Sequence, residues 1–235
     1  MIPIRDSVRS RRFPWVTLLI IAINVIVFAH ELTLSDQDFG LFLMTWGLVP
    51  VKVVGFIQGL PFSLFTDFPT LLTVVTSMFI HGGWLHIIGN MLYLWVFGDN
   101  VEDRLGRPRF VLFYLAAGGA GFIAHAVANA ASSIPAVGAS GAIAGVLGAY
   151  FLMFPQSRVL TIIPLGIFIQ LAQVPAILFL FFWFILQVIS GVASISPAHQ
   201  AAETTAWWAH IGGFFVGMLW TFLAGQVGSR RRNPV

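Results

Sequence analysis

The sequence predicts an all-α polytopic membrane protein with six transmembrane helices and a long interfacial first outer loop. Its 235 residues are 58% hydrophobic and only 9% charged, against about 25% charged in an average soluble domain. So few charges exclude a soluble globular protein, because they could not cover the core in water. Six mostly apolar stretches are long enough to cross about 30 Å of hydrocarbon as helices. They are residues 14–30, 84–98, 109–130, 138–155, 174–194 and 206–226.

The first span begins close after a basic N-terminal segment and has no small-x-small cleavage site, so we expect it to remain as an anchor. Between it and the second span lies an outer loop, 31–80, whose apolar part at 41–65 is interrupted by glycine, proline and polar residues. We interpret this part as lying on or in the membrane, the alternative being a seventh span.

The charges decide between these alternatives. Arginines flank both ends of the chain, and the positive-inside rule then predicts that both termini are cytoplasmic, which requires an even number of spans. The terminal arginines are Arg5, Arg9, Arg11, Arg12, Arg230, Arg231 and Arg232. Arg104, Arg107 and Arg109 are expected in the loop after the second span. Because the basic residues lie at membrane edges, the net charge of +3 indicates topology and no nucleic-acid partner. We expect a single domain, 1–235.

The second, fourth and sixth spans carry polar side chains near their starts: His86 and Asn90, Ser140, and His210. In the six-span arrangement these helices run in the same direction, so the side chains are expected within about 5–10 Å of the outer boundary. Polar groups inside a membrane are costly and point to function. His125 in the third span is more typical of packing, and the fifth span carries the polar Gln187.

Two glycine pairs predict that the fourth and sixth spans touch. Gly141 and Gly145, and Gly213 and Gly217, both have the GxxxG spacing that lets helix backbones approach closely. A hydrogen bond between Ser140 and His210 across that contact is sterically possible. The alternative is that the glycines only pack the helices and the serine bonds to its own helix.

This pattern fits acyl-transfer chemistry. A serine needs a neighbouring base, and imidazole suits neutral pH. His86, Asn90 and the Ser140 backbone N–H are candidates to stabilise an oxyanion; alternatively, His86 and Asn90 form a structural bond between helices. No Asp or Glu lies inside a span, so a Ser140–His210 dyad is expected. The chain has no cysteine, no HExxH metal motif and no nucleotide-binding loop. No metal or cofactor is therefore expected.

Three segments together resemble the rhomboid intramembrane serine proteases. They are HGGWLHIIGN from His81 to Asn90, GASG from Gly138 to Gly141, and AHIGG from Ala209 to Gly213 followed by Gly217. The resemblance covers about 77–226. It implies that Ser140 is the nucleophile, His210 the base, and His86 with Asn90 the oxyanion-hole side chains. It also implies structural roles for His81, Glu102 and Arg104.

The resemblance implies hydrolysis of peptide bonds in single-span membrane proteins near the outer face of a lipid bilayer, in a prokaryotic cell membrane. Residues 174–194 and the loop 196–203 resemble the family's gate and cap. Two positions depart from the pattern: Leu72 and Thr73 stand where relatives have a Trp-Arg pair, and Ala144 stands where an aromatic ring often packs on the histidine. The alternatives are a non-catalytic rhomboid-like protein that binds membrane helices and a small-solute transporter. No sequence feature specifies an oligomeric state.

Overall fold

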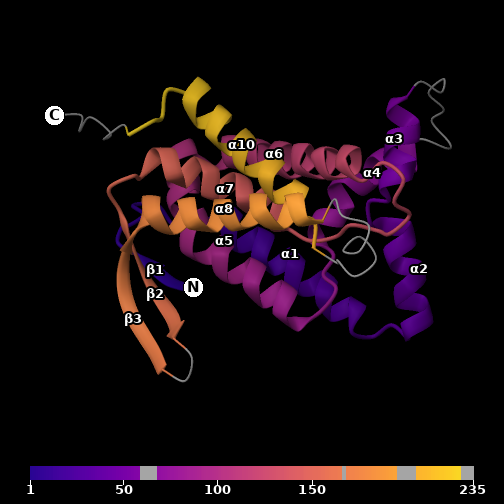
Figure 1. Cartoon of the computed structure of the whole chain (residues 1–235), viewed down its shortest axis with the longest axis horizontal. Coiled ribbons are helices and arrows are strands. Elements are labelled where there is room, and N and C mark those ends of the chain that lie inside the picture. Colours follow the sequence, from indigo (N-terminus) through magenta and orange to yellow (C-terminus); the bar gives the residue numbers. More distant parts are fainter. Residues whose placement is uncertain (59–67, 166–167, 195–204, 229–235) are drawn as a thin grey trace.

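The computed structural model describes residues 1–58, 68–165, 168–194 and 205–228. The expected cap at 196–203 and the basic tail at 230–232 lie outside these residues. Six apolar helices, one in each predicted span, lie side by side in a bundle (Figure 1), which confirms the predicted helical fold. They are α1 (Trp15–Glu31), α5 (Trp84–Leu105), α6 (Arg107–Ala128), α7 (Ser140–Met153), α8 (Ala176–Ala193) and α10 (Trp207–Leu223).

The helices differ in how well they match the thickness of a membrane. By length and composition, α6 and α8 are each sufficient to cross one. A third crossing results if α5 and the helical segment Pro69–Phe79, which meet at a bend of 80°, count together as one span. The other three, α1, α7 and α10, are apolar but shorter. The number of six spans therefore stays a prediction.

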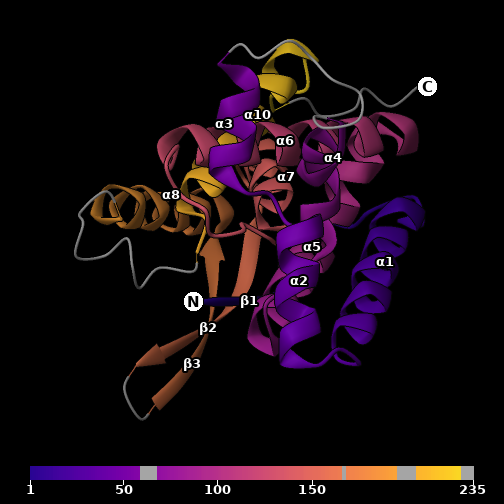
Figure 2. The same cartoon turned by 90° about the vertical axis from the view of Figure 1, so that its right-hand side faces the viewer.

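Helix α7 is the centre of the bundle. All its residues from Gly141 to Tyr150 are buried, as expected for a helix that is apolar on every face. In Figure 2, α7 lies among the other helices, with α1 and α8 on opposite sides of the molecule. A side chain at the start of α7 is thus placed inside the protein and not toward lipid.

The prediction of a loop after the second span is wrong. Helix α5 continues beyond residue 98 to Leu105, and α6 begins at Arg107, so Arg104, Arg107 and Arg109 lie in helices. Only Gly106 separates the two, with a φ of 81° that glycine adopts without strain. The polar residues 99–105 mark the border of the apolar stretch, but they do not stop the helix.

The described part of the predicted outer loop 31–80, here called the outer segment, contains short helices. They are α2 (Asp36–Trp46), α3 (Pro50–Ile57), α4 (Phe68–Thr76) and a 3₁₀ turn, η1 (Ser77–Phe79). The interrupting residues separate these helices: Ser35 caps the start of α2, Gly47 follows its end, and Pro50 opens α3. Between α2 and α3, Leu48 pairs with Ala136 through two backbone hydrogen bonds of 3.1 and 2.8 Å. This pairing ties the outer segment to the residues just before α7.

A three-stranded antiparallel sheet was not expected from the sequence. Its order is β1 (Ile2–Asp6), β2 (Arg158–Leu165) and β3 (Phe168–Pro175), and it lies at the end of the bundle where α7 finishes (Figure 1). At the same end, the Gly228 N–H donates to the Leu152 carbonyl at 2.9 Å. Residues near both ends of the chain therefore lie at one end of the bundle, as an even number of crossings requires.

A half-buried carboxyl group holds β1 against the helices. The Asp6 carboxylate accepts hydrogen bonds from the Tyr150 hydroxyl of α7 and, at 2.9 Å, from the Asn100 side-chain amide of α5. Burial raises the pKa of Asp6 from 3.8 to about 6; repulsion from Asp99 adds to this, and the Tyr150 hydrogen bond opposes it. Between about pH 4 and pH 6 the folded protein thus binds a proton that the unfolded chain has already released.

This raised pKa predicts that acid strengthens the fold. The contribution of Asp6 is fully present below pH 4 and is lost as the pH rises through 6, and about 1–2 kcal/mol of it is lost between pH 5 and pH 7.5. When the pH is raised from 5 to 7.5, we expect the thermal midpoint of the wild type in detergent to fall relative to that of Asp6→Asn, which has no titrating group at this position. Parallel midpoint curves for the two proteins would contradict this.

Candidate active site

The starts of α7 and α10 bring a serine and a histidine together. Ser140 is the first residue of α7, and His210 lies in the first turn of α10. Ser140 Oγ is 2.8 Å from His210 Nε2, which is hydrogen-bond distance, although the two residues are 70 positions apart in the sequence. Of the two alternatives for Ser140, the structure therefore has the contact across helices.

The backbone before Ser140 shapes one side of this pair. Gly138 has a φ of 123°, which disfavours any other residue, and a Cβ there would lie 2.5 Å from His86 Nε2. The His86 side chain thus lies directly over the backbone of the GASG segment. As the first residue of α7, Ser140 has a backbone N–H without an acceptor inside the helix. His86 Nε2 and this N–H therefore both lie at the segment that carries the serine.

Asn90 lies one turn after His86 on α5, and its side chain is hydrogen-bonded to His81. Its side-chain nitrogen is 2.9 Å from His81 Nε2. His81 is fully buried, and its backbone N–H donates to the Glu31 carboxylate at the end of α1. One hydrogen of the Asn90 amide is thereby used, and the second is left for the site. His81 thus connects the end of α1 with the first turns of α5.

The predicted site residues line one cavity of about 960 Å³. Its polar lining includes His86, Asn90, Ser140, Gln187 and His210, and among the described residues that line it none is Asp, Glu, Lys or Arg. In the part of the chain that the structure describes, no cluster of three or more His, Asp or Glu side chains could hold a metal ion. The chemistry available here is that of a hydroxyl, imidazoles and amides.

Close contact between α7 and α10 depends on their glycines. A Cβ on Gly213 would overlap the Gly141 carbonyl oxygen, and one on Gly217 would overlap that of Gly145. The glycine pairs thus bring the two backbones together as the GxxxG spacing predicted. This approach sets the separation of Ser140 and His210.

The His210 ring is fixed by residues of α8 and α10, since Ala144 is too small to reach it. Trp207 makes an edge contact with a centroid distance of 5.9 Å, and Trp183 lies at 6.0 Å. Phe214, another aromatic residue of α10, packs on Trp183 instead. Gln187 Oε1 lies 2.8 Å from His210 Nδ1. The sequence marked Gln187 as polar but did not predict this contact.

Two residues that the sequence singled out, Thr73 and His125, are not part of the Ser140–His210 pair. Thr73, at the position of the missing Trp-Arg pair, is buried in α4 and bonds to the Thr70 carbonyl of its own helix. His125 lies near Asn129, one turn later on the same chain segment, and has no hydrogen bond to Ser140 or His210. Neither residue joins the Ser140–His210 pair.

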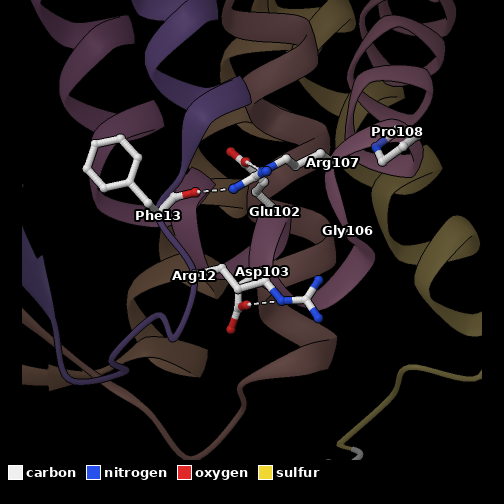
Figure 3. A pocket seen from close by; sticks show the side chains of 7 residues that line it. All are labelled: Arg12, Phe13, Glu102, Asp103, Gly106, Arg107 and Pro108. Atoms are coloured by element: carbon white, nitrogen blue, oxygen red, sulfur yellow. Dashed lines mark hydrogen bonds and ion pairs between the residues drawn. The ribbon is translucent and has the colours of Figure 1, made fainter.

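At the opposite end of α5, Glu102 caps a different helix. Its carboxylate accepts hydrogen bonds from the Val16 and Thr17 backbone N–H groups at 3.1 and 2.8 Å, which stabilises the otherwise uncapped start of α1. Arg104 donates to the Gln226 side chain and lies over the Phe154 ring. Near Glu102, a cavity of about 430 Å³ is lined by Arg12, Asp103 and Arg107 (Figure 3). About 24 Å of helix separates Glu102 from His86.

Fold and site together define a helical membrane protein with a Ser–His pair inside its bundle. The model of the rhomboid domain matches residues 69–227, and the chain therefore belongs to the rhomboid family. As a member of that family it is a polytopic integral membrane protein.

The chain is similar to several rhomboid proteins of known name. It is 44% identical to rhomboid protease GluP of Bacillus subtilis over 85 residues, 36% of this chain and 16% of that protein. It is 29% identical to Rhomboid-like protein 11, chloroplastic, of Arabidopsis thaliana over 68% of this chain and 55% of that protein. With RHOMBOID-like protein 1 of the same plant it shares 26% identity over 94% of this chain and 57% of that protein. These matches span less than two thirds of each relative.

Proposed function

We propose that this chain is an intramembrane serine endopeptidase in which Ser140 is the nucleophile and His210 the general base. The observation that carries the proposal is the 2.8 Å separation of Ser140 Oγ and His210 Nε2 within a cavity inside the bundle. A serine hydroxyl is a weak nucleophile until a neighbouring base takes its proton, and the imidazole is positioned to do so.

In the first half of the reaction, Ser140 Oγ attacks the carbonyl carbon of the scissile peptide bond while its proton passes to His210 Nε2. The negative charge that develops on the carbonyl oxygen is stabilised by the Ser140 backbone N–H, the His86 imidazole and the free hydrogen of the Asn90 amide. The C–N bond then breaks, and His210 gives its proton to the leaving amine. The product is an acyl ester on Ser140.

In the second half, water attacks the ester carbonyl and His210 takes the proton of the water. The ester bond breaks, Ser140 recovers its proton and the new carboxyl terminus leaves. The same three donors stabilise the second oxyanion. Apart from the imidazolium that His210 forms for a time, no charged side chain takes part, which agrees with a described lining that contains no Asp, Glu, Lys or Arg.

The substrates are single-span membrane proteins, cleaved near the outer face of the bilayer. The pair lies at the starts of α7 and α10, and water reaches a helix end more easily than the middle of a membrane. A substrate segment must unwind to expose its peptide bond, so small and helix-destabilising residues are favoured. Both termini of the enzyme are then cytoplasmic, at the end of the bundle that carries the sheet.

Cleavage by purified protein in liposomes tests this function. We expect the wild type to cleave a single-span substrate that carries small residues near the outer face of the bilayer. Ser140→Ala should give no product while binding the substrate with the same affinity. If the wild type captures the substrate but neither protein cleaves it, the chain is a non-catalytic binder of membrane helices, and the proposal is wrong.

A further inference from the structure

Gln187 is a buried amide in α8, a helix in which most residues are not buried. Its neighbours on α8, Leu186 and Ile189, are 58% and 60% exposed, whereas Gln187 is 7% exposed. A polar side chain in such a position is costly unless both ends of its amide are hydrogen-bonded. The Ser–His chemistry described above does not account for it.

Both ends of this amide have partners. The Gln187 side-chain nitrogen donates to the Trp183 backbone carbonyl, one turn earlier, at 2.9 Å. That bond fixes the orientation of the amide, so the oxygen Oε1 faces His210 Nδ1 at 2.8 Å. A carbonyl oxygen only accepts hydrogen bonds. Nδ1 of the neutral imidazole must therefore carry the ring proton.

The protonation of one ring nitrogen decides the state of the other. With its proton on Nδ1, the neutral imidazole has a bare Nε2, and this is the atom that lies 2.8 Å from Ser140 Oγ. The three hydrogen bonds form one directed chain from Ser140 through His210 to Gln187 and the Trp183 carbonyl. Only this tautomer leaves the base ready to accept the serine proton.

We propose that Gln187 is the positioning residue of the Ser140–His210 pair, an uncharged third member that holds the imidazole in the reactive tautomer. The inference rests on the proposed protease function. The cavity explains why an amide and not a carboxylate has this place: among the described residues that line it there is no Lys or Arg to compensate a buried negative charge. An amide orients the ring without that cost.

Helix α8 also supplies the ring contact that α7 lacks. Trp183, one turn before Gln187, lies at 6.0 Å from the His210 ring, while the α7 position available for such a contact is Ala144. Gln187 holds the Nδ1 edge of the ring and Trp183 covers a face. Both restraints on His210 from this side thus come from one helix.

Three variants test the proposal. Gln187→Met keeps the length and volume but has no amide; Gln187→Glu keeps an acceptor oxygen in either protonation state; Leu112→Ala is the control on an exposed face of α6, outside the predicted gate. We expect Gln187→Met to lower kcat about 10- to 100-fold with KM unchanged. Gln187→Glu should recover most of the lost rate, and Leu112→Ala should stay within about twofold of the wild type.

The ¹⁵N spectrum of the histidine rings gives a second readout that does not depend on turnover. In the wild type we expect the His210 signals, assigned by their loss in His210→Ala, to show a single tautomer protonated at Nδ1. In Gln187→Met they should show a mixture. A folded Gln187→Met protein with the wild-type kcat and tautomer would overturn the proposal. Equal losses in Gln187→Met and Gln187→Glu, accompanied by reduced thermal stability, would also overturn it in favour of a purely structural role.

Ser140→Ala in the same assay separates this inference from the protease function itself. If wild type and Ser140→Ala release product at the same rate, the protease function is wrong, and the role of Gln187 falls with it. If Ser140→Ala is inactive but Gln187→Met matches the wild type, only the role of Gln187 is wrong.

Discussion

Replacing His210 with alanine is expected to lower kcat for a single-span substrate about 10³- to 10⁴-fold while leaving the protein folded. Without the imidazole, Ser140 Oγ loses the base to which it is hydrogen-bonded, and loss of a positioned general base typically costs this much. KM should change little, since the ring contacts the nucleophile and not the remote parts of the substrate. The measurement is cleavage in liposomes at several substrate densities.

The control for this variant is His30→Ala. His30 is an exposed histidine at the end of α1 and is not among the residues that line the cavity, so the same chemical change is made outside the site. It should retain the wild-type rate. If His210→Ala keeps more than about a tenth of the wild-type kcat, His210 is not the base.

Replacing Gly217 with alanine is expected to destabilise the protein by about 3 kcal/mol, although alanine is the better helix former by about 1 kcal/mol. The added methyl group would overlap the Gly145 carbonyl oxygen, which is backbone and cannot rotate away, so α7 and α10 must separate. The separation would also pull His210 from Ser140. Thermal or denaturant unfolding in detergent measures the first effect, and the cleavage rate measures the second.

Gly89→Ala is the matched control on α5. A Cβ at that position would meet nothing within 4 Å, so the same substitution should be neutral or should stabilise the protein by up to about 1 kcal/mol. Equal stability of the two variants would mean that the contact between α7 and α10 does not depend on the size of Gly217.

The placement of the site was largely predictable because few polar residues lie in the apolar stretches. His86, Ser140 and His210 each follow closely on the start of a helix, and a shared helix direction with a rise of 1.5 Å per residue brings them to one level. The glycine spacing on 138–155 and 206–226 then indicated which two helices touch. Both signals are local in the sequence.

Other contacts could not be predicted because they depend on which face of an element meets its neighbour. Helix α8 is apolar on all sides, so its pattern does not show that Gln187 points to His210. The sheet pairs Ile2 with Ile162, a partner 160 residues away, and apolar runs such as 159–163 are equally typical of other structures. In the outer segment, proline and glycine indicated a loop, whereas they separate short helices.

The most direct test of the proposed chemistry is to find the residue that a fluorophosphonate modifies in the membrane-embedded protein. Mass spectrometry of the digested wild type should find the adduct on Ser140, and labelling should fall steeply in His210→Ala, because only an activated serine reacts at a useful rate. Absence of an adduct in a protein that still binds substrate, or an adduct on another serine, would contradict the assignment of Ser140 and His210 as nucleophile and base.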